Sequence, residues 1–281
     1  MNLALVLHFY CGKKNRDKRS NHLISGLYNA VSGSIAQERT LEIISNNLAN
    51  MSTVGYKGDI PLFKSVLSNT QNQMQEAPGV ALISLNEQSS LFKDANSFVV
   101  LDKIVTDFSQ GVFKGTGNKL DVALDGDGFF AVETPKGIRY TRQGNFSLDS
   151  SNRLVTQEGY PVMSSSDNEI VIDGKTIEIN NNGEISADGK IVGNLNVVDF
   201  PKPYSLKKIG NSLFASIEKD SQAKEYAVKQ GFLELSNINV IREMIQMIDS
   251  LRSYQSYQKV IKMSMEVVAS RAVNEIGRLN T

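Results

Sequence analysis

Residue types that dominate catalysis and metal binding are scarce in this chain. Among its 281 residues there is one cysteine, Cys11, and there are two histidines, His8 and His22. A single cysteine excludes an intrachain disulfide, and residues 23–281 contain neither imidazole nor thiol. The sequence therefore argues against Ser-His-Asp and Cys-His catalysis, and against most zinc sites, over nearly all of its length.

Net charge and long apolar runs are also lacking. The chain has 30 basic and 30 acidic residues, so no net charge attracts it to nucleic acid or to an anionic membrane. No apolar run reaches the roughly 18 residues that a membrane-spanning helix needs. Tryptophan is absent, and the 6 prolines are outnumbered by 21 glycines, which suits turn-rich β structure beside helices. The length is sufficient for two modest domains.

The most regular pattern lies at the end of the chain, in residues 236–279. Apolar residues recur at steps of three or four, which predicts one helix of about 40 residues, roughly 60 Å long. The segment has no proline, and Ser236 or Asn237 can cap its start. So long a helix cannot bury its apolar stripe in an ordinary domain, so we expect it to pack against another long helix. The predicted stripe is Ile241, Met244, Ile245, Ile248, Leu251, Tyr254, Tyr257, Ile261, Met265, Val268, Ala272, Ile276 and Leu279.

A second helical pattern, of about 25 residues, lies near the start of the chain in residues 24–50. Its apolar positions are Leu27, Val31, Ile35, Leu41, Ile44 and Leu48. We expect the two terminal helices to pair as a coiled-coil-like assembly domain, because each has an apolar stripe that needs a partner. The middle of the chain would then be an insertion between them.

Between residues 98 and 214 the period of the apolar residues changes to two, which predicts strands. Turn-forming pairs occur at Asp173-Gly174, Asn182-Gly183 and Asp188-Gly189. The first pair lies between alternating isoleucines and predicts a hairpin of residues 170–172 with residues 177–179. No helical pattern is interleaved, so we predict an antiparallel, all-β central domain and an α+β fold for the whole chain.

These patterns divide the chain into five segments. Residues 1–22 are predicted to be a disordered leader or a mis-assigned start. Residues 23–68 form an N-terminal helical assembly segment, in which residues 60–67 make a helical turn or two, and residues 69–97 are a polar connector. Residues 98–215 form the β domain, and residues 216–281 form a C-terminal helical assembly segment.

Three aspartates, Asp121, Asp125 and Asp127, lie close together in the stretch Asp-Val-Ala-Leu-Asp-Gly-Asp-Gly. Neighbouring carboxylates can act as general acid and base or bind a cation, so a carboxylate-based hydrolase is one alternative function. The further ligands of a calcium loop are missing, however, and Asp-Gly-Asp-Gly is typical of turns. We therefore predict a structural turn, and no catalytic, cofactor-binding or metal-binding residues. The glycine-rich stretch 115–119 matches no phosphate-binding motif and is also predicted to be a turn.

The chain resembles the bacterial flagellar rod and hook proteins in ordered motifs that extend over most of its length. The motifs lie at residues 27–33 and 46–57, at residues 120–130, 140–146 and 159–162, and at residues 233–240. The motif residues that we single out are Asn46, Asn47, Leu48, Asn50, Thr53, Gly55, Tyr56, Lys57, Asp121, Gly126, Gly128, Phe129 and Phe130. Residues 1–22 depart from the family pattern, so we expect translation to start near Leu23 or the leader to be dispensable.

The resemblance implies a structural protein and no catalysis. Proteins of this family carry terminal helices that form the inner tube of an axial assembly, with the β domain outside it. They are exported by the flagellar type III apparatus without a cleaved signal, and the assembled rod transmits torque across the periplasm. The implied partners are other rod proteins and copies of the chain itself, with no nucleic acid, small-molecule substrate or cofactor.

Two alternatives remain open at this point. Within the family, residues 253–261 and 274–278 are most similar to the proximal rod subunits, the distal rod subunits come next, and a hook-type axial protein is a further alternative. From a different class, the chain could be a secreted binding module, in which the β domain recognises a ligand and the helices only oligomerise it.

Overall fold

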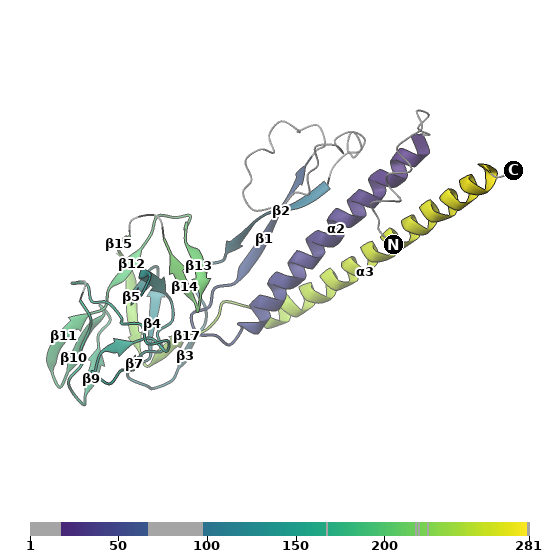
Figure 1. Cartoon of the computed structure of the whole chain (residues 1–281). Helices are drawn as coiled ribbons and strands as arrows, with labels where there is room; N and C mark the ends of the chain where they lie inside the picture. The colour runs from purple at the N-terminus through teal and green to yellow at the C-terminus, as the bar shows by residue number, and fades with distance from the viewer. Residues whose placement is uncertain are drawn as a thin grey trace. The chain divides into compact units, whose positions relative to one another are not determined.

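The computed structural model describes residues 18–66, 98–166, 168–216, 218, 220–223 and 225–279 (Figure 1). The chain divides into two compact units. The first contains α2 (Lys18–Ala49) up to Ser45, β1 (Asp59–Val66) from Ile60, β2 (Phe98–Thr106) up to Val105, and α3 (Val240–Leu279) from Met244. The second contains the other described residues, which lie between 46 and 59 and between 106 and 243.

Two long helices confirm the two helical patterns. α3 has 40 residues, as its stripe predicts, and α2 has 32 residues because it starts at Lys18. Residues 18–22 therefore belong to the helix, and their assignment to a disordered leader is wrong. No proline or glycine separates Lys18 from the predicted start, so nothing in that stretch ends the helix. The rest of the predicted leader and the polar connector, residues 69–97, lie outside the described residues.

The two helices contact each other where α2 has a glycine. A β-carbon added at Gly33 would lie 2.6 Å from Cζ of Tyr257, so the tyrosine ring occupies space that only a glycine leaves free. Beside this contact, Gln258 Nε2 donates a hydrogen bond of 3.1 Å to Ser34 Oγ. The close approach of α2 and α3 therefore depends on the smallest residue at position 33.

The predicted apolar stripes are only partly covered in the single chain. Ile44 is buried, while Leu27, Leu41, Leu48, Tyr254, Tyr257, Ile261 and Val268 are half-buried. Val31, Ile35, Ile241, Met244, Ile248 and Leu251 are exposed. The positions on α3 that are half-buried follow one another at Tyr254, Tyr257 and Ile261, whereas most of the exposed stripe positions lie near its start, and Met265 is exposed further along. Part of the stripe on α3 is therefore covered, whereas the part near its start is exposed in the portion of the chain that the structure describes.

β1 and β2 form a two-stranded sheet, in which Lys64 Nζ lies 2.7 Å from Asp102 Oδ1. The helical turn that we predicted at residues 60–67 is therefore wrong over the described residues. Pro61 gives a physical reason, because proline removes a backbone donor and is unfavourable inside a helix but tolerated in an edge strand. β2 begins where the β domain was predicted to begin, but it belongs with β1 to the first unit as far as Val105.

The second unit is built from short strands. They are β3 (Phe113–Gly115), β4 (Val122–Gly126), β5 (Phe129–Thr134), β6 (Gly137–Thr141), β7 (Ser147–Leu148), β8 (Leu154–Val155), β9 (Ile177–Ile179), β10 (Glu184–Ala187), β11 (Lys190–Asn194), β12 (Val197–Asp199), β13 (Lys207–Gly210), β14 (Leu213–Ala215), β15 (Ser221–Gln222), β16 (Tyr226–Gln230) and β17 (Phe232–Glu234). The largest sheet has the order β13-β14-β6-β5-β12-β15, and β11-β10-β9 form a second sheet. The remaining pairs are β16-β4, β17-β3 and β7-β8.

Every strand pairing with an assigned register in the second unit is antiparallel, as predicted. The alternation of β5 directs Phe130 into a mainly aliphatic core and Phe129 into an aromatic cluster with Phe200 and Phe214. β16 and β17 follow residue 215, so the segment predicted to be helical from residue 216 begins with strands. The α+β class is confirmed.

Two of the three predicted turns are confirmed and one is wrong. Gly183 and Gly189 have positive φ values of 85° and 79° in the turns that join β9 to β10 and β10 to β11. Asp173-Gly174 joins no hairpin, because Ile177–Ile179 pairs with β10 instead. The carboxylate of Asp188 accepts hydrogen bonds from the N–H groups of residues 175 and 176, which ties that backbone to the next turn.

Candidate functional site, a buried polar junction

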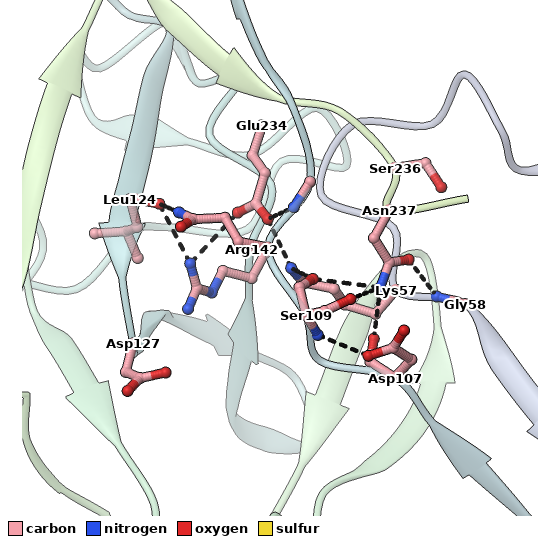
Figure 2. A network of polar contacts seen from close by, with 12 residues as sticks. Lys57, Gly58, Asp107, Ser109, Leu124, Asp127, Arg142, Glu234, Ser236 and Asn237 are labelled. Atoms are coloured by element: carbon pink, nitrogen blue, oxygen red, sulfur yellow. Dashed lines mark hydrogen bonds and ion pairs between the residues drawn. The ribbon is translucent and has the colours of Figure 1, made fainter. Parts of the chain in front are cut away.

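Buried charged side chains gather at one place in the second unit, where segments far apart in the sequence meet (Figure 2). Lys57, Arg142 and Glu234 are 1%, 5% and 1% exposed. Such residues are almost never fully buried unless they are paired. We call these three residues and Asn237, with the backbone groups that they bind, the junction.

Glu234, at the end of β17, is shared by three donors. Lys57 Nζ lies 2.6 Å from its Oε1, and the N–H of Gly111 donates to the same oxygen over 2.8 Å. Arg142 Nη1 lies 3.4 Å from its Oε2. One carboxylate thus holds a lysine that follows α2 and an arginine that follows β6.

Both cations also donate to backbone carbonyl groups, although Arg142 Nε is buried without a hydrogen-bond partner among the described residues. Lys57 Nζ donates to the carbonyl of Ser109 over 2.8 Å, and Arg142 Nη2 donates to the carbonyl of Gly126 over 2.8 Å. Burial lowers the pKa of Lys57, the ion pair with Glu234 counteracts this effect, and the charge of Arg142 lowers the pKa further. Lys57 and Arg142 therefore repel each other, and Glu234 is the side chain that both pair with.

Asn237 binds the chain next to Lys57. Its Oδ1 accepts a hydrogen bond of 2.8 Å from the N–H of Gly58, and its Nδ2 donates to the carbonyl of Asp107 over 2.8 Å. Its own N–H donates to the carbonyl of Tyr56 over 3.4 Å. Residues 56–58, 107–109 and 234–237 are thereby joined shortly before α3 begins at Val240.

The sequence motif Asn46-Asn47 at the end of α2 is bonded to the start of β1. The buried amide of Asn47 forms two hydrogen bonds of 2.9 Å with the backbone of Asp59, accepting from its N–H and donating to its carbonyl. The hydroxyl of Tyr56 donates to Asn46 Oδ1 over 2.8 Å. Burial, with the nearby charges of Asp59 and Glu243, raises the pKa of Tyr56 to about 12.

Lys208, from β13, contacts residues 56–59, where the loop between α2 and β1 ends. Its Nζ lies 2.9 Å from Asp59 Oδ2 and 4.3 Å from the centre of the Tyr56 ring, and it also donates to the carbonyl of Lys57. Burial lowers the pKa of Lys208, and the ion pair with Asp59 opposes that shift. The loop is therefore held by a third cation that stays outside the Glu234 cluster.

Gly55 is required by two features of the backbone. Its φ is +64°, and an added β-carbon would lie 2.5 Å from the carbonyl carbon of Arg142. Its N–H donates to the backbone carbonyl of Glu234 over 2.8 Å. Only glycine adopts this conformation at so close an approach without strain.

The structure brings five of the thirteen predicted motif residues together and distributes the others between the end of α2 and the β structure. Asn46, Asn47, Gly55, Tyr56 and Lys57 contact the junction or its supporting loop. Leu48, Asn50 and Thr53 form the end of α2 and the turn after it, where Thr53 Oγ1 lies 3.3 Å from Asn50 Oδ1. Phe129, Phe130 and Gly128 are buried in or beside the two cores, and Gly126 contributes the carbonyl that accepts from Arg142.

The three clustered aspartates do not form a common site. Asp121 accepts from Asn118 Nδ2 over 3.1 Å, Asp125 pairs with Lys229, and Asp127 pairs with Lys202, each ion pair at 2.6 Å. Among the residues that the structure describes, no group of three or more His, Cys, Asp or Glu side chains is placed to hold a metal ion. The aspartates serve the turns and strand ends on which they lie.

Sequence reasoning placed Arg142, Glu234 and Asn237 within motifs but gave Arg142 and Glu234 no role. It proposed Ser236 or Asn237 as the cap of the terminal helix, whereas the side chain that accepts from the first turn is that of Asn239, whose Oδ1 accepts from the N–H of Arg242 over 3.1 Å. One usable signal was the stretch Phe232-Leu233-Glu234-Leu235, where a single carboxylate interrupts an apolar run. A charge in such a place is either exposed by the alternation of a strand or buried with a partner. Nothing in the sequence shows that the partner is Lys57, 177 positions earlier.

Comparison with known families matches three separate segments. Residues 27–57 match the family described as flagella basal body rod protein, residues 123–187 match the flagellar hook protein FlgE/F/G D1 domain, and residues 229–270 match the flagellar basal body rod FlgEFG protein C-terminal segment. Lys57, Arg142 and Glu234 each lie in a different one of these segments.

Individual proteins are similar over most of the chain. The flagellar basal-body rod protein FlgG of Bacillus subtilis (strain 168) is 32% identical over 262 residues, covering 88% of this chain and 97% of that protein. The flagellar hook-basal body complex protein FlhO of the same strain is 30% identical, covering 92% of this chain and all of that protein. The flagellar basal-body rod protein FlgF of Mesorhizobium japonicum is 28% identical, covering 79% of this chain and 86% of that protein. No described helix is long and apolar enough to cross a membrane.

Proposed function

The chain belongs to the flagellar basal-body rod family and is a structural subunit of the flagellar rod, and on this premise we propose that it polymerises through its terminal helices. In this proposal α2 and α3 pair in a coiled-coil-like assembly domain, and the β structure between them is an insertion. The subunits form an axial drive shaft that transmits motor torque.

Exposed apolar side chains at the start of α3 carry the proposal. Ile241, Met244, Ile245, Ile248 and Leu251 are 73%, 48%, 56%, 51% and 44% exposed. Covering all five would contribute about 4–8 kcal/mol per subunit, since burial of one such side chain contributes about 1.5–3 kcal/mol. A second copy, packed by a rotation that does not close a ring, would cover this surface and extend a helical filament.

The proposal also names the remaining partners and the location. Other rod proteins are the axial neighbours, and the flagellar type III apparatus exports the chain into the periplasm without a cleaved signal. No catalysis, cofactor, nucleic acid or small-molecule substrate takes part. The exposed apolar stripe supports a role in subunit assembly and not in catalysis.

Aspartate substitutions on α3 test the assembly surface. Ile248→Asp places a carboxylate in the proposed dry contact, so the soluble subunit should keep its β structure while rod completion and swimming are lost. Ile261→Asp, one turn after Tyr257, should have the same effect and also weaken the contact of α3 with α2. Gln246→Asp is the matched control, because Gln246 is polar and exposed, and this variant should swim.

The experiment needs electron microscopy of basal bodies and a motility assay on the same strains. Normal rods in both isoleucine variants would show that α3 is not the assembly surface. Loss of motility in the Gln246→Asp strain as well would show that the assay reports general damage.

The proximal position in the rod is the second part of the proposal, with the distal position as the alternative. Its support is the similarity of residues 253–261 and 274–278 to proximal subunits, and relatives named FlgF and FlgG both match the chain. Complementation separates the two positions. A proximal subunit should restore rods in a strain that lacks FlgF and fail in one that lacks FlgG, and the reverse result would assign the distal position.

A further inference from the structure

Two cations and one carboxylate meet in the buried junction, and they come from distant parts of the chain. Glu234 lies 177 positions after Lys57 and 92 positions after Arg142. All three side chains are at most 5% exposed. The junction therefore forms only when three separate segments are in place together.

Without Glu234 the same packing would be strongly unfavourable. Lys57 and Arg142 would be desolvated beside each other, and neither would keep a salt-bridge partner among the described side chains, since Asp107 and Asp127 act on them only through charge at longer range. Removing one partner of a buried pair destabilises because it leaves an unpaired charge. Their backbone acceptors, the carbonyl groups of Ser109, Leu124 and Gly126, provide partial charges only. The segment around Lys57 can therefore dock against the Arg142 loop at low cost only after Glu234 has arrived.

Backbone hydrogen bonds link the same two segments. The N–H of Gly55 donates to the carbonyl of Glu234, and the N–H of Gly58 donates to Asn237 Oδ1, each over 2.8 Å. In the other direction, the N–H of Asn237 donates to the carbonyl of Tyr56. Residues 55–58 and 234–237 thus provide hydrogen-bond partners for some of each other's backbone N–H and carbonyl groups.

We infer that the junction is a charge-gated latch, in which docking of Glu234 is the condition for docking of residues 46–59 onto the β structure of the second unit. In the open form the β core is folded, while residues 46–59 and 234–243 are both released. The latch couples the segment that ends α2 to the segment that starts α3, so both are fixed in one step. This inference concerns folding of the single chain and does not depend on the proposed assembly.

Amide hydrogen exchange on the full-length Glu234→Gln variant tests the latch. Glutamine keeps the shape and an acceptor for the Gly111 N–H but leaves two unneutralised cations. Peptides within residues 46–59 and 234–243 should then exchange together about a hundredfold faster, while β4, β5 and β6 stay protected. Glu169→Gln is the matched control, since Glu169 pairs with Arg153 at a site that is 38% exposed, and its exchange should equal that of the wild type.

A second substitution distinguishes charge gating from simple packing. The double variant Lys57→Met/Glu234→Gln removes one of the two repelling cations. The amides of residues 46–59 should therefore exchange at least tenfold more slowly in it than in Glu234→Gln alone. A role in packing alone predicts the opposite, because the double variant would then be at least as damaged as the single one. That result, or unchanged exchange in Glu234→Gln, would overturn the inference.

A measurement on the wild-type chain covers the case in which Glu234→Gln does not fold. In native-state exchange at increasing urea, residues 46–59 and 234–243 should open in one step, with a common midpoint below that of β4, β5 and β6. Separate midpoints for the two segments would show that they dock independently and that no latch exists.

Discussion

Substituting Asn47 by alanine should destabilise the second unit far more than the same change at Asn46, although the two residues are neighbours in one motif. Asn47 is 3% exposed, and its amide forms two short hydrogen bonds with the backbone of Asp59. Asn46 is exposed and accepts only the hydroxyl of Tyr56. That hydroxyl has a second acceptor, Asn47 Oδ1, within 3.4 Å.

The expected loss of unfolding free energy in Asn47→Ala follows from the hydrogen bonds that the substitution removes. Two hydrogen bonds contribute about 1 kcal/mol each, and a backbone group left without a partner costs about 1–3 kcal/mol. Asp59 is only half-buried, so water can replace part of what the amide supplied. Alanine also gains about 0.5 kcal/mol of helix propensity at either position. We expect Asn47→Ala to lose about 1.5–3 kcal/mol of unfolding free energy and Asn46→Ala to change it by less than about 0.5 kcal/mol.

Urea unfolding of the purified chain measures this difference. Because the chain lacks tryptophan, far-UV circular dichroism and tyrosine fluorescence are the natural signals. Equal m-values in the three proteins would allow the midpoints to be compared directly. If Asn46→Ala and Asn47→Ala lose the same free energy, the amide bridge to Asp59 does not hold the loop and our account of the motif is wrong.

Three further predictions concern other parts of the chain. Gly26→Ala should stabilise α2 by about 0.5–1 kcal/mol, because no atom lies within 4 Å of the new β-carbon. Gly33→Ala should instead destabilise the contact with Tyr257 by about 1–2 kcal/mol, and amide exchange of α2 and α3 measures both effects. The pKa of Tyr56 is raised from 10.0 to about 12 in the folded chain, so its stabilising contribution is complete below pH 10 and is lost as the pH rises through 12. The advantage of the wild type over Tyr56→Phe in unfolding free energy should therefore shrink between these pH values, and a constant difference would contradict the assignment. Asp127→Asn should change the unfolding free energy by less than about 1 kcal/mol, because its ion pair with lysine is exposed, and added calcium should not shift the melting temperature of the wild type.

The helices and the class of the β structure were predictable because their signals are local. The stripe that begins at Ile241 gives the length of α3, and the alternation of apolar residues gives antiparallel strands. Periodicity does not say which neighbour covers a side chain. Ile44 and Ile35 carry the same signal, yet one is 3% and the other 52% exposed. The pattern alone therefore does not separate positions that the chain itself covers from positions that it leaves exposed.

The junction was not predictable for the opposite reason, because its contacts are entirely long-range. Lys57 was recognised as part of a motif, but its partner is remote in the sequence, and the apolar run around Glu234 shows only that this carboxylate is unusual, not what it pairs with. The hairpin at Asp173-Gly174 failed in a similar way. Its turn signal was local, but residues 177–179 pair with β10, and the N–H groups of residues 175 and 176 bind the carboxylate of Asp188, 13 and 12 positions away.

The tyrosine ring at Gly33 has a mechanical consequence for the pair of helices. One turn of α2 away in either direction, about 5.4 Å, the ring would meet side chains such as Ala30 and Gln37 in place of bare backbone. Sliding α3 along α2 would therefore bring the ring of Tyr257 into a steric clash with larger side chains of α2. The contact therefore opposes axial displacement of one helix along the other, which is the displacement that thrust along the helices would produce.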